Sequence, residues 1–308
     1  MILVVGSINV DVVFEVHGIP STGQTILAHN KTTNPGGKGA NQAVAASKLG
    51  ADVVLLGCVG TDGNGTALLE SLNNAGVNTD YVLRTDKVHT ASAYICVSEA
   101  GENAIVVDSC ANYLVTPEYL LAHEHLFKQA DYCILQMEIP EDAVKKAIVL
   151  SHLNSVKVIL NPSPLENFDM SILDGVEYII ANKDEATTLI DMPNVPEISA
   201  DSWVHFMRCH GIRNLIITQG EKGAHHYSAS GNDAFYPSQP QHTVDTTGAG
   251  DTFLGAFTHA IASNYTVDSA IKFANAAAGI TVTRKGAQKS FPNKEELNEY
   301  LLNTKPKN

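Results

Sequence analysis

Val244-Asp245-Thr246-Thr247-Gly248-Ala249-Gly250-Asp251-Thr252 is the stretch of the chain that decides the fold. Its first half is polar and typical of a turn, and an apolar helix opens directly after it at Phe253. Small residues allow the backbone to come close to a bound group, and the first N–H groups of a helix have no partner within the helix. That end of a helix also carries partial positive charge. We therefore expect Gly248, Ala249 and Gly250 to form a turn that binds an anion such as a phosphoryl group.

Asp251 adds a carboxylate to this turn. An aspartate at a helix start most often only caps the helix or complements its dipole. Here the carboxylate follows glycines that expose it, and Asp245 supplies a second acidic group nearby. An anion-binding turn with a base beside it is the equipment needed for phosphoryl transfer to a hydroxyl group.

A second glycine-rich stretch, Asn34-Pro35-Gly36-Gly37-Lys38-Gly39-Ala40-Asn41-Gln42-Ala43, leads into a helix of small residues that Gly50 ends. It is not a P-loop, because no glycine stands five residues before Gly37 and no serine or threonine follows Lys38. A Gly-Gly turn can instead press its backbone against a small ligand, to which Lys38 and Asn41 offer hydrogen-bond donors.

The two stretches resemble the signatures of one family. Residues 245–251 are similar to the C-terminal signature of the ribokinase-like (PfkB) sugar and nucleoside kinases, and residues 36–43 are similar to their N-terminal signature. The resemblance implies that Asp251 is the catalytic base and that Gly248, Ala249 and Gly250 form the anion hole. It extends, with its motifs in order, over residues 6–290.

Strand and helix patterns alternate along most of the chain. Continuous apolar runs typical of buried strands occupy residues 2–5, 53–58, 132–135, 156–160, 178–180 and 215–218. Helical patterns follow Lys38 and occupy residues 66–75, 117–128, 141–153, a segment from about 183, 200–210, 251–262, 267–281 and 294–302. Such alternation implies right-handed crossovers between parallel strands. The sequence thus predicts one ribokinase-like α/β domain over residues 1–308, a doubly wound, mostly parallel sheet flanked by helices.

One region breaks this alternation. Residues 91–97 and 104–107 have strand patterns and flank a loop that contains Gly101, which indicates a hairpin. Together with the extended residues 12–33, the hairpin could form a small antiparallel flap over the strand ends. We expect a discontinuous β-sheet lid formed by about residues 10–35 and 88–110. In the family such lids pair to form the dimer interface, and an apolar flap edge needs covering, so we expect a homodimer through the lid.

Several polar residues are candidates for sugar binding. Asn9 and Asp11 follow the first strand, and open α/β sheets bind ligands at the carboxyl ends of their strands, although a solvated loop is the simpler explanation. Glu138 follows the strand at 132–135 in the same way. The resemblance implies that the sugar is held by Asn9, Asp11, Gly36, Gly37, Lys38, Asn41, Glu138 and Asp251.

Asn182 and Glu185 have the spacing Asn-x-x-Glu. This spacing is that of a helix capping box, and it is also the family's motif for ordering Mg²⁺ through bound water, so both roles stay open. Thr218 and Gly220 lie in a turn after a strand, whose ordinary meaning is a β-turn. The resemblance implies nucleotide contacts at Asn182, Thr218, Gly220, Gly223, Gly250 and Asn275.

The resemblance implies that the segment after the helix at 267–281 and the loop of Asp245 together enclose a monovalent cation. Carbonyl oxygens that replace water suit potassium. The ligands implied, mostly through backbone oxygen, are Asp245, Thr247, Thr281, Arg284, Gly286 and Ser290.

Composition limits the class of protein. The chain has 308 residues, 44% of them hydrophobic and 17% charged, as in soluble proteins with a sizeable core. The net charge of −13 argues against a nucleic-acid partner or an anionic membrane. The first apolar run is too short for a signal peptide, and no run approaches the roughly 20 apolar residues of a membrane helix. Five dispersed cysteines without a Cys-x-x-Cys pair indicate reduced thiols, so we expect a cytoplasmic protein.

The sequence therefore predicts a kinase that transfers the γ-phosphoryl group of ATP to O5 of D-ribose, with Mg²⁺ and a potassium activator. A related kinase for another substrate (deoxyribose, fructose or an adenosine-like nucleoside) stays open, as does a non-catalytic sugar sensor on the same fold. A dinucleotide-dependent oxidoreductase is disfavoured, because the first strand ends in Gly-Ser-Ile and not in Gly-x-Gly-x-x-Gly.

Overall fold

The structure, a computed structural model, describes residues 1–166, 168–191 and 198–303. Its largest sheet has eight strands in the order β14-β13-β12-β11-β10-β9-β1-β4. The strands from β12 to β4 are parallel, and β13 and β14 add an antiparallel edge. In chain order these strands are β1 (Ile2–Val5), β4 (Val53–Leu56), β9 (Tyr132–Gln136), β10 (Lys157–Asn161), β11 (Tyr178–Asn182), β12 (Asn214–Thr218), β13 (Gly223–Ser228) and β14 (Asp233–Pro237).

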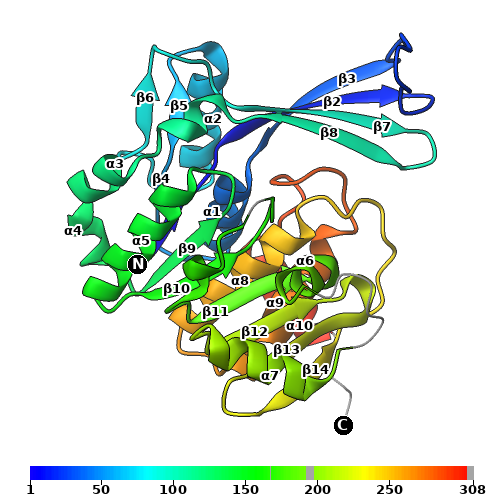
Figure 1. Cartoon of the computed structure of the whole chain (residues 1–308). Coiled ribbons are helices and arrows are strands. Elements are labelled where there is room, and N and C mark those ends of the chain that lie inside the picture. Colours follow the sequence, from blue (N-terminus) through cyan, green and yellow to red (C-terminus); the bar gives the residue numbers. More distant parts are fainter. Residues whose placement is uncertain (167, 192–197, 304–308) are drawn as a thin grey trace.

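Helices cover both faces of this sheet (Figure 1). Alternate residues of β1 point to opposite faces, so Ile2 and Val4 pack in one core layer and Leu3 and Val5 in the other. The first layer includes side chains of α1 (Lys38–Lys48), α2 (Gly63–Asn74), α8 (Ala249–Ala262), α9 (Val267–Thr281) and α10 (Lys294–Asn303). The second includes side chains of α3 (Pro117–Ala122), α4 (Glu124–Phe127), α5 (Glu141–Leu153), α6 (Lys183–Leu189) and α7 (Ala200–Cys209). The predicted doubly wound α/β fold is confirmed.

The structure adds details to the predicted elements. The strand expected at 53–58 is divided into β4 and β5 (Cys58–Gly60), and β5 pairs with β6 (Leu83–Thr85). The helix expected at 117–128 is divided between α3 and α4 at His123. The described part of the chain also contains three short 3-10 helices, namely η1 (Cys110–Leu114), η2 (Met170–Leu173) and η3 (Gly220–Lys222).

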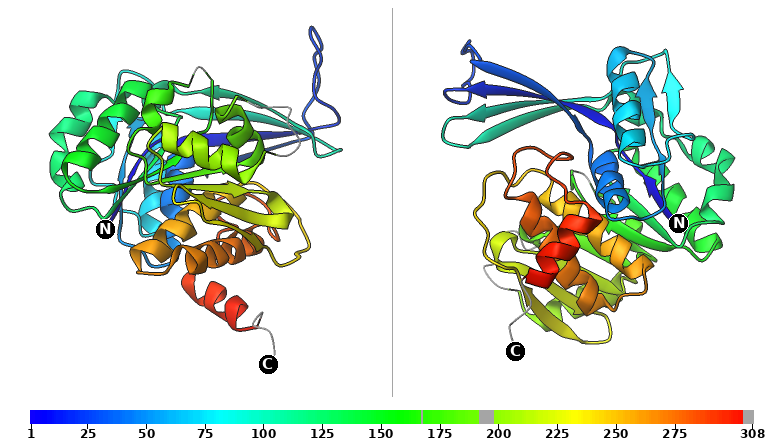
Figure 2. Two further views of the ribbon diagram at one scale, coloured as in Figure 1. Left: turned by 60° about the horizontal axis from the view of Figure 1, so that its bottom comes forward. Right: turned by 180° about the vertical axis from the view of Figure 1, so that it is seen from behind.

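The lid is a separate four-stranded sheet that projects from the body as a long ribbon (Figures 1 and 2). Its order is β3-β2-β7-β8, with β2 (Asn9–Val16), β3 (Asn30–Gly36), β7 (Ser92–Ser98) and β8 (Asn103–Asp108). The expectation of an antiparallel flap is wrong for its central pair, because β2 and β7 are parallel. Both strands leave the body in the same direction, and each returns through its own antiparallel partner.

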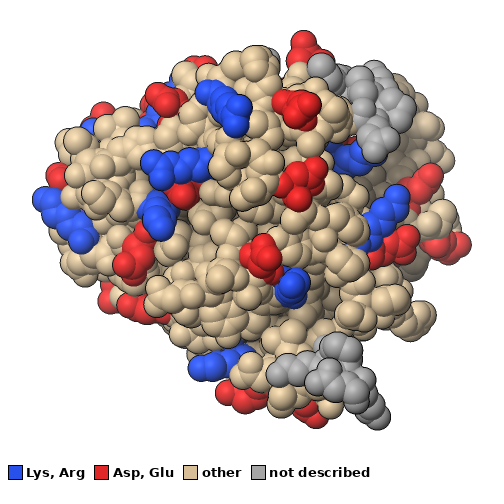
Figure 3. All heavy atoms as spheres, turned by 90° about the horizontal axis from the view of Figure 1, so that it is seen from below, with Lys and Arg blue, Asp and Glu red and all other residues tan. Residues whose placement is uncertain are grey.

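The surface mixes charges of both signs. On the face seen in Figure 3, basic and acidic side chains are interspersed. Within the described part of the chain, no helix is both long and apolar enough to cross a membrane.

Candidate active site

The start of α1 lies against the segment that follows β1. Gly37 caps α1 with a φ of 88°, a left-handed conformation that favours glycine. A Cβ atom on Gly39 would lie 2.6 Å from the backbone nitrogen of Ser7, so this contact also requires glycine. The N–H of Ala40 donates to the carbonyl of Ser7 at 2.9 Å. The glycine-rich stretch therefore brings the first turn of α1 to the carboxyl end of the sheet.

Asn9 and Asp11 lie on β2, where the lid leaves the body. The Asp11 carboxylate lies over Gly36 of the neighbouring strand, where a Cβ atom would be 2.2 Å from both carboxylate oxygens. Asn9 is buried, and its Oδ1 accepts a hydrogen bond from Nδ2 of Asn112 at 2.7 Å. Asn112 Oδ1 in turn accepts from the N–H of Ile8 at 3.0 Å. These bonds fix the orientation of the Asn9 amide.

Glu138 follows β9 and is hydrogen-bonded to two other segments, the one after β1 and the start of α1. One of its carboxylate oxygens accepts from the Ser7 hydroxyl at 2.5 Å and from the N–H of Lys38 at 3.0 Å. The loop after β9 is therefore joined to the segment after β1 and to the start of α1.

Asp251 lies in the first turn of α8. Its Oδ2 accepts from Nδ2 of Asn41 at 2.9 Å and its Oδ1 accepts from Nε2 of Gln42 at 3.0 Å. Both donors belong to α1, so α1 and α8 together hold the carboxylate. Asp251 is partly exposed.

The turn before Asp251 has the features of an anion site. Gly248 has a φ of 77°, and a Cβ atom there would lie 2.7 Å from the ring of Phe291. Gly250 is exposed and faces open space, since a Cβ atom on it would have no neighbour within 4 Å. Among the described residues, the N–H groups of Gly250 and Asp251 find no acceptor. Free donors and open space at a helix start are what an incoming anion requires.

Charged groups from several segments of the chain influence one another here. Burial raises the pKa of Asp11 to about 7, and the charges of Glu138 and Asp251 add to the rise. Burial also raises the pKa of Asp251, against the charge of Lys38 and the two amide hydrogen bonds. Burial alone would lower the pKa of Lys38, but the carboxylates of Asp251, Glu138 and Glu185 outweigh it and the pKa is raised. A carboxylate whose pKa lies above its usual range accepts a proton more readily, which is what a general base requires.

Asn182 and Glu185 form the capping box that their spacing predicts. The N–H of Glu185 donates to Asn182 Oδ1 at 2.8 Å, and the N–H of Asn182 donates to Glu185 Oε2 at 2.9 Å. Thr218 is paired in register with Asn182 at the carboxyl ends of β12 and β11. The charge of Glu185 also helps to raise the pKa of Lys38.

The other predicted nucleotide contacts have structural partners. A Cβ atom on Gly223 would lie 2.1 Å from the carbonyl oxygen of Tyr236, so close strand packing alone requires this glycine. Nδ2 of Asn275 donates to the same carbonyl at 3.0 Å. Gly220 has a φ of 57° and open space around it. Among these three, Gly220 is the one whose surroundings leave room for a ligand.

The loop of Asp245 and the loop after α9 are joined. Asp245 Oδ1 accepts from the N–H of Thr247 at 2.9 Å, and its Oδ2 accepts from the N–H of Gly286 at 2.8 Å. Burial acts to raise the pKa of Asp245, but these hydrogen bonds outweigh it and hold the pKa below its usual value. A carboxylate that stays ionised therefore lies where the two loops meet.

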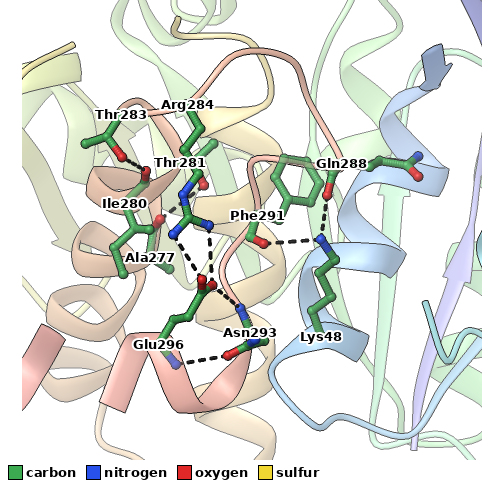
Figure 4. A network of polar contacts seen from close by, with 10 residues as sticks. All are labelled: Lys48, Ala277, Ile280, Thr281, Thr283, Arg284, Gln288, Phe291, Asn293 and Glu296. Atoms are coloured by element: carbon green, nitrogen blue, oxygen red, sulfur yellow. Dashed lines mark hydrogen bonds and ion pairs between the residues drawn. The ribbon is translucent and has the colours of Figure 1, made fainter. Parts of the chain in front are cut away.

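Of the remaining predicted cation ligands, Thr281 is the last residue of α9 and Arg284 lies on the loop after it (Figure 4). Ser290 lies further along the same loop. The Arg284 guanidinium pairs with Glu296 at 3.0 Å, which leaves its backbone oxygen as the available ligand. The hydroxyl of Thr281 donates to Ala277 and Thr252 oxygens, and that of Ser290 donates to the carbonyl of Ala287 at 2.6 Å. Nζ of Lys48 donates to the carbonyls of Gln288 and Phe291 and so fixes this loop to α1.

Four residues that were not predicted from the sequence form hydrogen bonds to the candidate site residues or to their partners. They are Gln42, Asn112, Gln136 and Gln288. Gln42 stands inside the N-terminal signature, next to Asn41, and this position was its one available signal. The other three come from distant parts of the chain, and nothing in their local sequence indicates the contact.

The chain is similar to known carbohydrate kinases over nearly its whole length. A family model described as pfkB family carbohydrate kinase matches residues 1–294. A ribokinase of Bacillus subtilis is 38% identical over 97% of this chain and 99% of its own length. A deoxyribokinase of Salmonella typhi is 34% identical over 97% and 98%. The solved structure of Arabidopsis thaliana ribokinase complexed with ribose and ATP is 30% identical over 97% of this chain and 98% of that chain, with a TM-score of 0.90.

Proposed function

Because this chain belongs to the pfkB family of carbohydrate kinases, we propose that it transfers the γ-phosphoryl group of ATP to O5 of D-ribose, giving D-ribose 5-phosphate and ADP. The observation that carries the proposal is the Asp251 carboxylate, held by two amides beside the open turn of Gly250. Two of the ribokinases among the relatives cover 97% and 96% of the chain, which supports ribose as the acceptor.

The sugar is bound where β2, α1 and the loop after β9 meet. Asp11 and Glu138 supply carboxylate oxygens for sugar hydroxyls, and Lys38 supplies an ammonium group. The Asn9 amide, fixed by Asn112, supplies a further donor. The remaining contacts of this proposal are the backbone of Gly36 and Gly37 and the side chains of Asn41 and Asp251. A sugar with several hydroxyls needs such a set of charged and amide partners.

In the reaction, Asp251 takes the proton of the O5 hydroxyl. The O5 electron pair then forms the new bond to the γ-phosphorus, and the bond from that phosphorus to the β–γ bridging oxygen breaks, so that this electron pair leaves with ADP. The turn at Gly248, Ala249 and Gly250 stabilises the charge on the transferred group. The N–H groups of Gly250 and Asp251 act here, because the N–H of Ala249 already donates to the carbonyl of Thr246. A positioned base contributes about 10²- to 10⁴-fold, and orientation and charge stabilisation supply the rest.

The nucleotide lies along the ends of β11 and β12, against Asn182, Thr218, Gly220, Gly223, Gly250 and Asn275. The side chains of Asn182 and Asn275 already have partners, so their contacts with ATP use remaining donors and acceptors. Glu185 holds Mg²⁺ through water, which fits a carboxylate that uses only Oε2 in its capping box. Bound magnesium neutralises charge on the phosphates.

A potassium ion lies between the loop of Asp245 and the loop after α9. Three observations fit a site lined by oxygen atoms. Asp245 is ionised, and it accepts a hydrogen bond from the N–H of Gly286 on the other loop. The guanidinium of Arg284 is paired with Glu296, so Arg284 offers its backbone oxygen. Its ligands in this proposal are Asp245, Thr247, Thr281, Arg284, Gly286 and Ser290. Bound potassium adds positive charge near the anion turn.

We further propose that the protein is a cytoplasmic homodimer that associates through its lid and has no nucleic-acid or membrane partner. All five cysteines are free thiols, which suits a reducing compartment. The mixed surface charge and the net charge of −13 do not favour a polyanion. The lid strand β8 carries exposed apolar side chains at Ile105, Val106 and Val107.

The test is an ADP-release assay with ribose, deoxyribose, fructose and nucleosides, run with potassium and with sodium. The proposal expects ribose to have the highest kcat/KM and potassium to raise the rate. A higher kcat/KM for deoxyribose would assign the second candidate, which the deoxyribokinase relative favours. Saturable ribose binding with no ADP formed would instead support the sugar sensor.

A further inference from the structure

Both oxygens of the Asp251 carboxylate are occupied by side-chain amides, and each amide is held by a second one. Gln288 Nε2 donates to Asn41 Oδ1 at 3.0 Å, and Asn41 Nδ2 donates to Asp251 Oδ2 at 2.9 Å. Gln136 Nε2 donates to Gln42 Oε1 at 2.7 Å, and Gln42 Nε2 donates to Asp251 Oδ1 at 3.0 Å. We call these two chains of hydrogen bonds the amide relays.

The four amides are removed from solvent. Gln136 is 0% exposed, Gln42 1%, and Asn41 and Gln288 are 7% exposed each. They come from three distant segments, namely the first turns of α1, the end of β9 and the loop after α9. In such surroundings water does not screen a wrongly placed dipole, so the direction of each amide matters more than at the surface.

A single amide beside a carboxylate has two orientations. One presents its NH₂ group, which attracts the carboxylate, and the other presents its oxygen, which repels it. A second donor on the amide oxygen removes this ambiguity, because the NH₂ group must then point the other way. Gln288 does this for Asn41, and Gln136 does it for Gln42.

One buried acceptor shows the cost of this arrangement. Gln136 Oε1 has no hydrogen-bond partner among the described residues. It lies against Gly6, where a Cβ atom would be 1.9 Å from it. If the Gln136 amide turned over, its oxygen would face Oε1 of Gln42. Two acceptors repel each other, so this hydrogen bond of the relay would be lost. The unpaired oxygen is therefore the consequence of keeping the Gln136 NH₂ group on Gln42, and such an unpaired buried group calls for an explanation of this kind.

We propose that Gln136 and Gln288 are positioning residues of the phosphoryl transfer: through Gln42 and Asn41 they fix the orientation of the Asp251 carboxylate and favour its ionised form. This inference rests on the proposed function of Asp251 as the base. Neither glutamine touches the sugar or ATP in the proposed complex. Gln288 is itself anchored, since Lys48 Nζ donates to its carbonyl at 2.6 Å (Figure 4).

The test replaces each outer glutamine by methionine, which has a similar length and no donor. Gln136→Met and Gln288→Met are compared with wild type and with Asn214→Leu. Asn214 is a matched control: it too is hydrogen-bonded, to the Glu177 carbonyl and to His226, but at the amino end of β12. Thermal unfolding of each variant establishes that the fold is retained.

We expect kcat to fall about 10- to 100-fold in each outer-glutamine variant. Removing a residue that orients the ligands of a functional group typically reduces activity by this factor. KM for ATP should change less than threefold in both variants, because neither relay reaches the proposed nucleotide contacts of β11 and β12. KM for ribose should also change less than threefold in Gln136→Met, because Gln42 is not a proposed sugar contact. The lost donors stabilised the ionised carboxylate, so the acidic limb of the kcat–pH profile should move to higher pH. Asn214→Leu should change neither kcat nor the pH profile.

A second measurement does not depend on turnover. The ¹³C signal of the Asp251 carboxyl group, assigned by its loss in Asp251→Asn, is titrated in the ligand-free protein. Its pKa should be higher in both variants than in wild type. If no sugar is phosphorylated but this shift is present, the proposed function fails and the relays stand. Folded variants with wild-type kcat and an unchanged Asp251 titration would overturn the relays.

Discussion

Asp251 is the single residue on which the proposed chemistry depends. Asp251→Asn keeps the size of the side chain and removes the base, so we expect kcat to fall at least about 10²- to 10⁴-fold. Nucleotide affinity should change little, since the free N–H groups of the turn belong to the backbone. ADP release and calorimetric ATP binding measure the two effects. Turnover of ribose at the wild-type rate would show that another group takes the proton.

The two glycines of the turn give a matched pair of substitutions. Gly248→Ala places a side chain at a φ of 77° and against Phe291, so we expect a loss of roughly 1–2 kcal/mol from backbone strain alone. Gly250→Ala meets no atom within 4 Å, and alanine favours the helix by up to about 1 kcal/mol. Its methyl group nevertheless enters the space assigned to the transferred phosphoryl group, where a displacement of 1 Å can cost about 10²-fold in rate.

Urea unfolding and steady-state kinetics separate these two glycines. We expect Gly248→Ala to be less stable than wild type, and Gly250→Ala to be at least as stable but much slower. A Gly250→Ala enzyme with wild-type kcat would place the phosphoryl group elsewhere.

The raised pKa of Asp11 predicts that sugar binding depends on pH. Its pKa is raised from 3.8 to about 7, so the carboxylate that we propose as an acceptor for the sugar hydroxyls forms only as the pH passes through 7. KM for ribose should therefore fall between pH 6 and pH 8, and Asp11→Asn should have a higher KM that changes little over this range. A wild-type KM that is flat over the same range would contradict the assignment.

The raised pKa of Asp11 also makes the free energy of unfolding depend on pH. Between pH 3.8 and about 7 the folded protein holds a proton on Asp11 that the unfolded chain has lost. The contribution of Asp11 to the free energy of unfolding therefore falls as the pH rises through this window. Asp11→Asn should remove this part of the pH dependence in urea unfolding curves.

At the scale of the elements, the loop after α9 is held to α1 by one ammonium group. Nζ of Lys48 donates to the carbonyls of Gln288 at 2.6 Å and of Phe291 at 3.2 Å (Figure 4). Lys48→Met leaves both carbonyls without this donor, and we expect a loss of about 1.5–3 kcal/mol in the free energy of unfolding. The looser loop should also raise the potassium concentration needed for half-maximal activity.

Lys128→Met is the control for this prediction. Lys128 forms an exposed pair with Glu124 one helical turn away, and such pairs contribute about 0.3–0.5 kcal/mol. Equal losses in the two variants, measured by urea unfolding, would mean that Lys48 does not clamp the loop.

The sequence predicted the elements whose signal is local. The run Ile2–Val5 is apolar throughout because both faces of β1 are covered, and the structure buries every residue of it. Strands β13 and β14 were not predicted, since the polar residues of Gly223–Ser228 in β13 break the apolar pattern. The parallel pairing of β2 with β7 was missed because pairing depends on where each strand leaves the body, which no short window records.

The same limit applies to the site. Asp251 and the glycines of its turn could be singled out because one turn of chain contains both. Asn112 and Gln136 could not, because their partners Asn9 and Gln42 are separated from them by 103 and 94 residues. The contacts that orient a functional side chain arise from the tertiary fold.

At the scale of the whole molecule, the lid has one face that the site uses and one that it leaves open. Asp11 is in register with Ala93, and Ala93 with Val107, so these residues share the face that carries the proposed sugar contact. Tyr94 and Val106 pair with each other on the opposite face, where they are 44% and 68% exposed. An exposed apolar face on an isolated sheet indicates an interaction surface.

This outer face leads to a prediction for assembly. If two copies associate through their lids, the wild-type protein should have twice the chain mass of 32.9 kDa in light scattering. Val106→Lys places a charge in the centre of the apolar face, and desolvating an unpaired charge is costly, so we expect the variant to have the mass of one chain. Leu153→Lys is the control: it charges an equally exposed residue (74%) at the end of α5 and should leave the mass unchanged. A wild type that stays monomeric at the highest concentration reached, or a Val106→Lys variant that remains dimeric, would exclude the outer face of the lid as the interface.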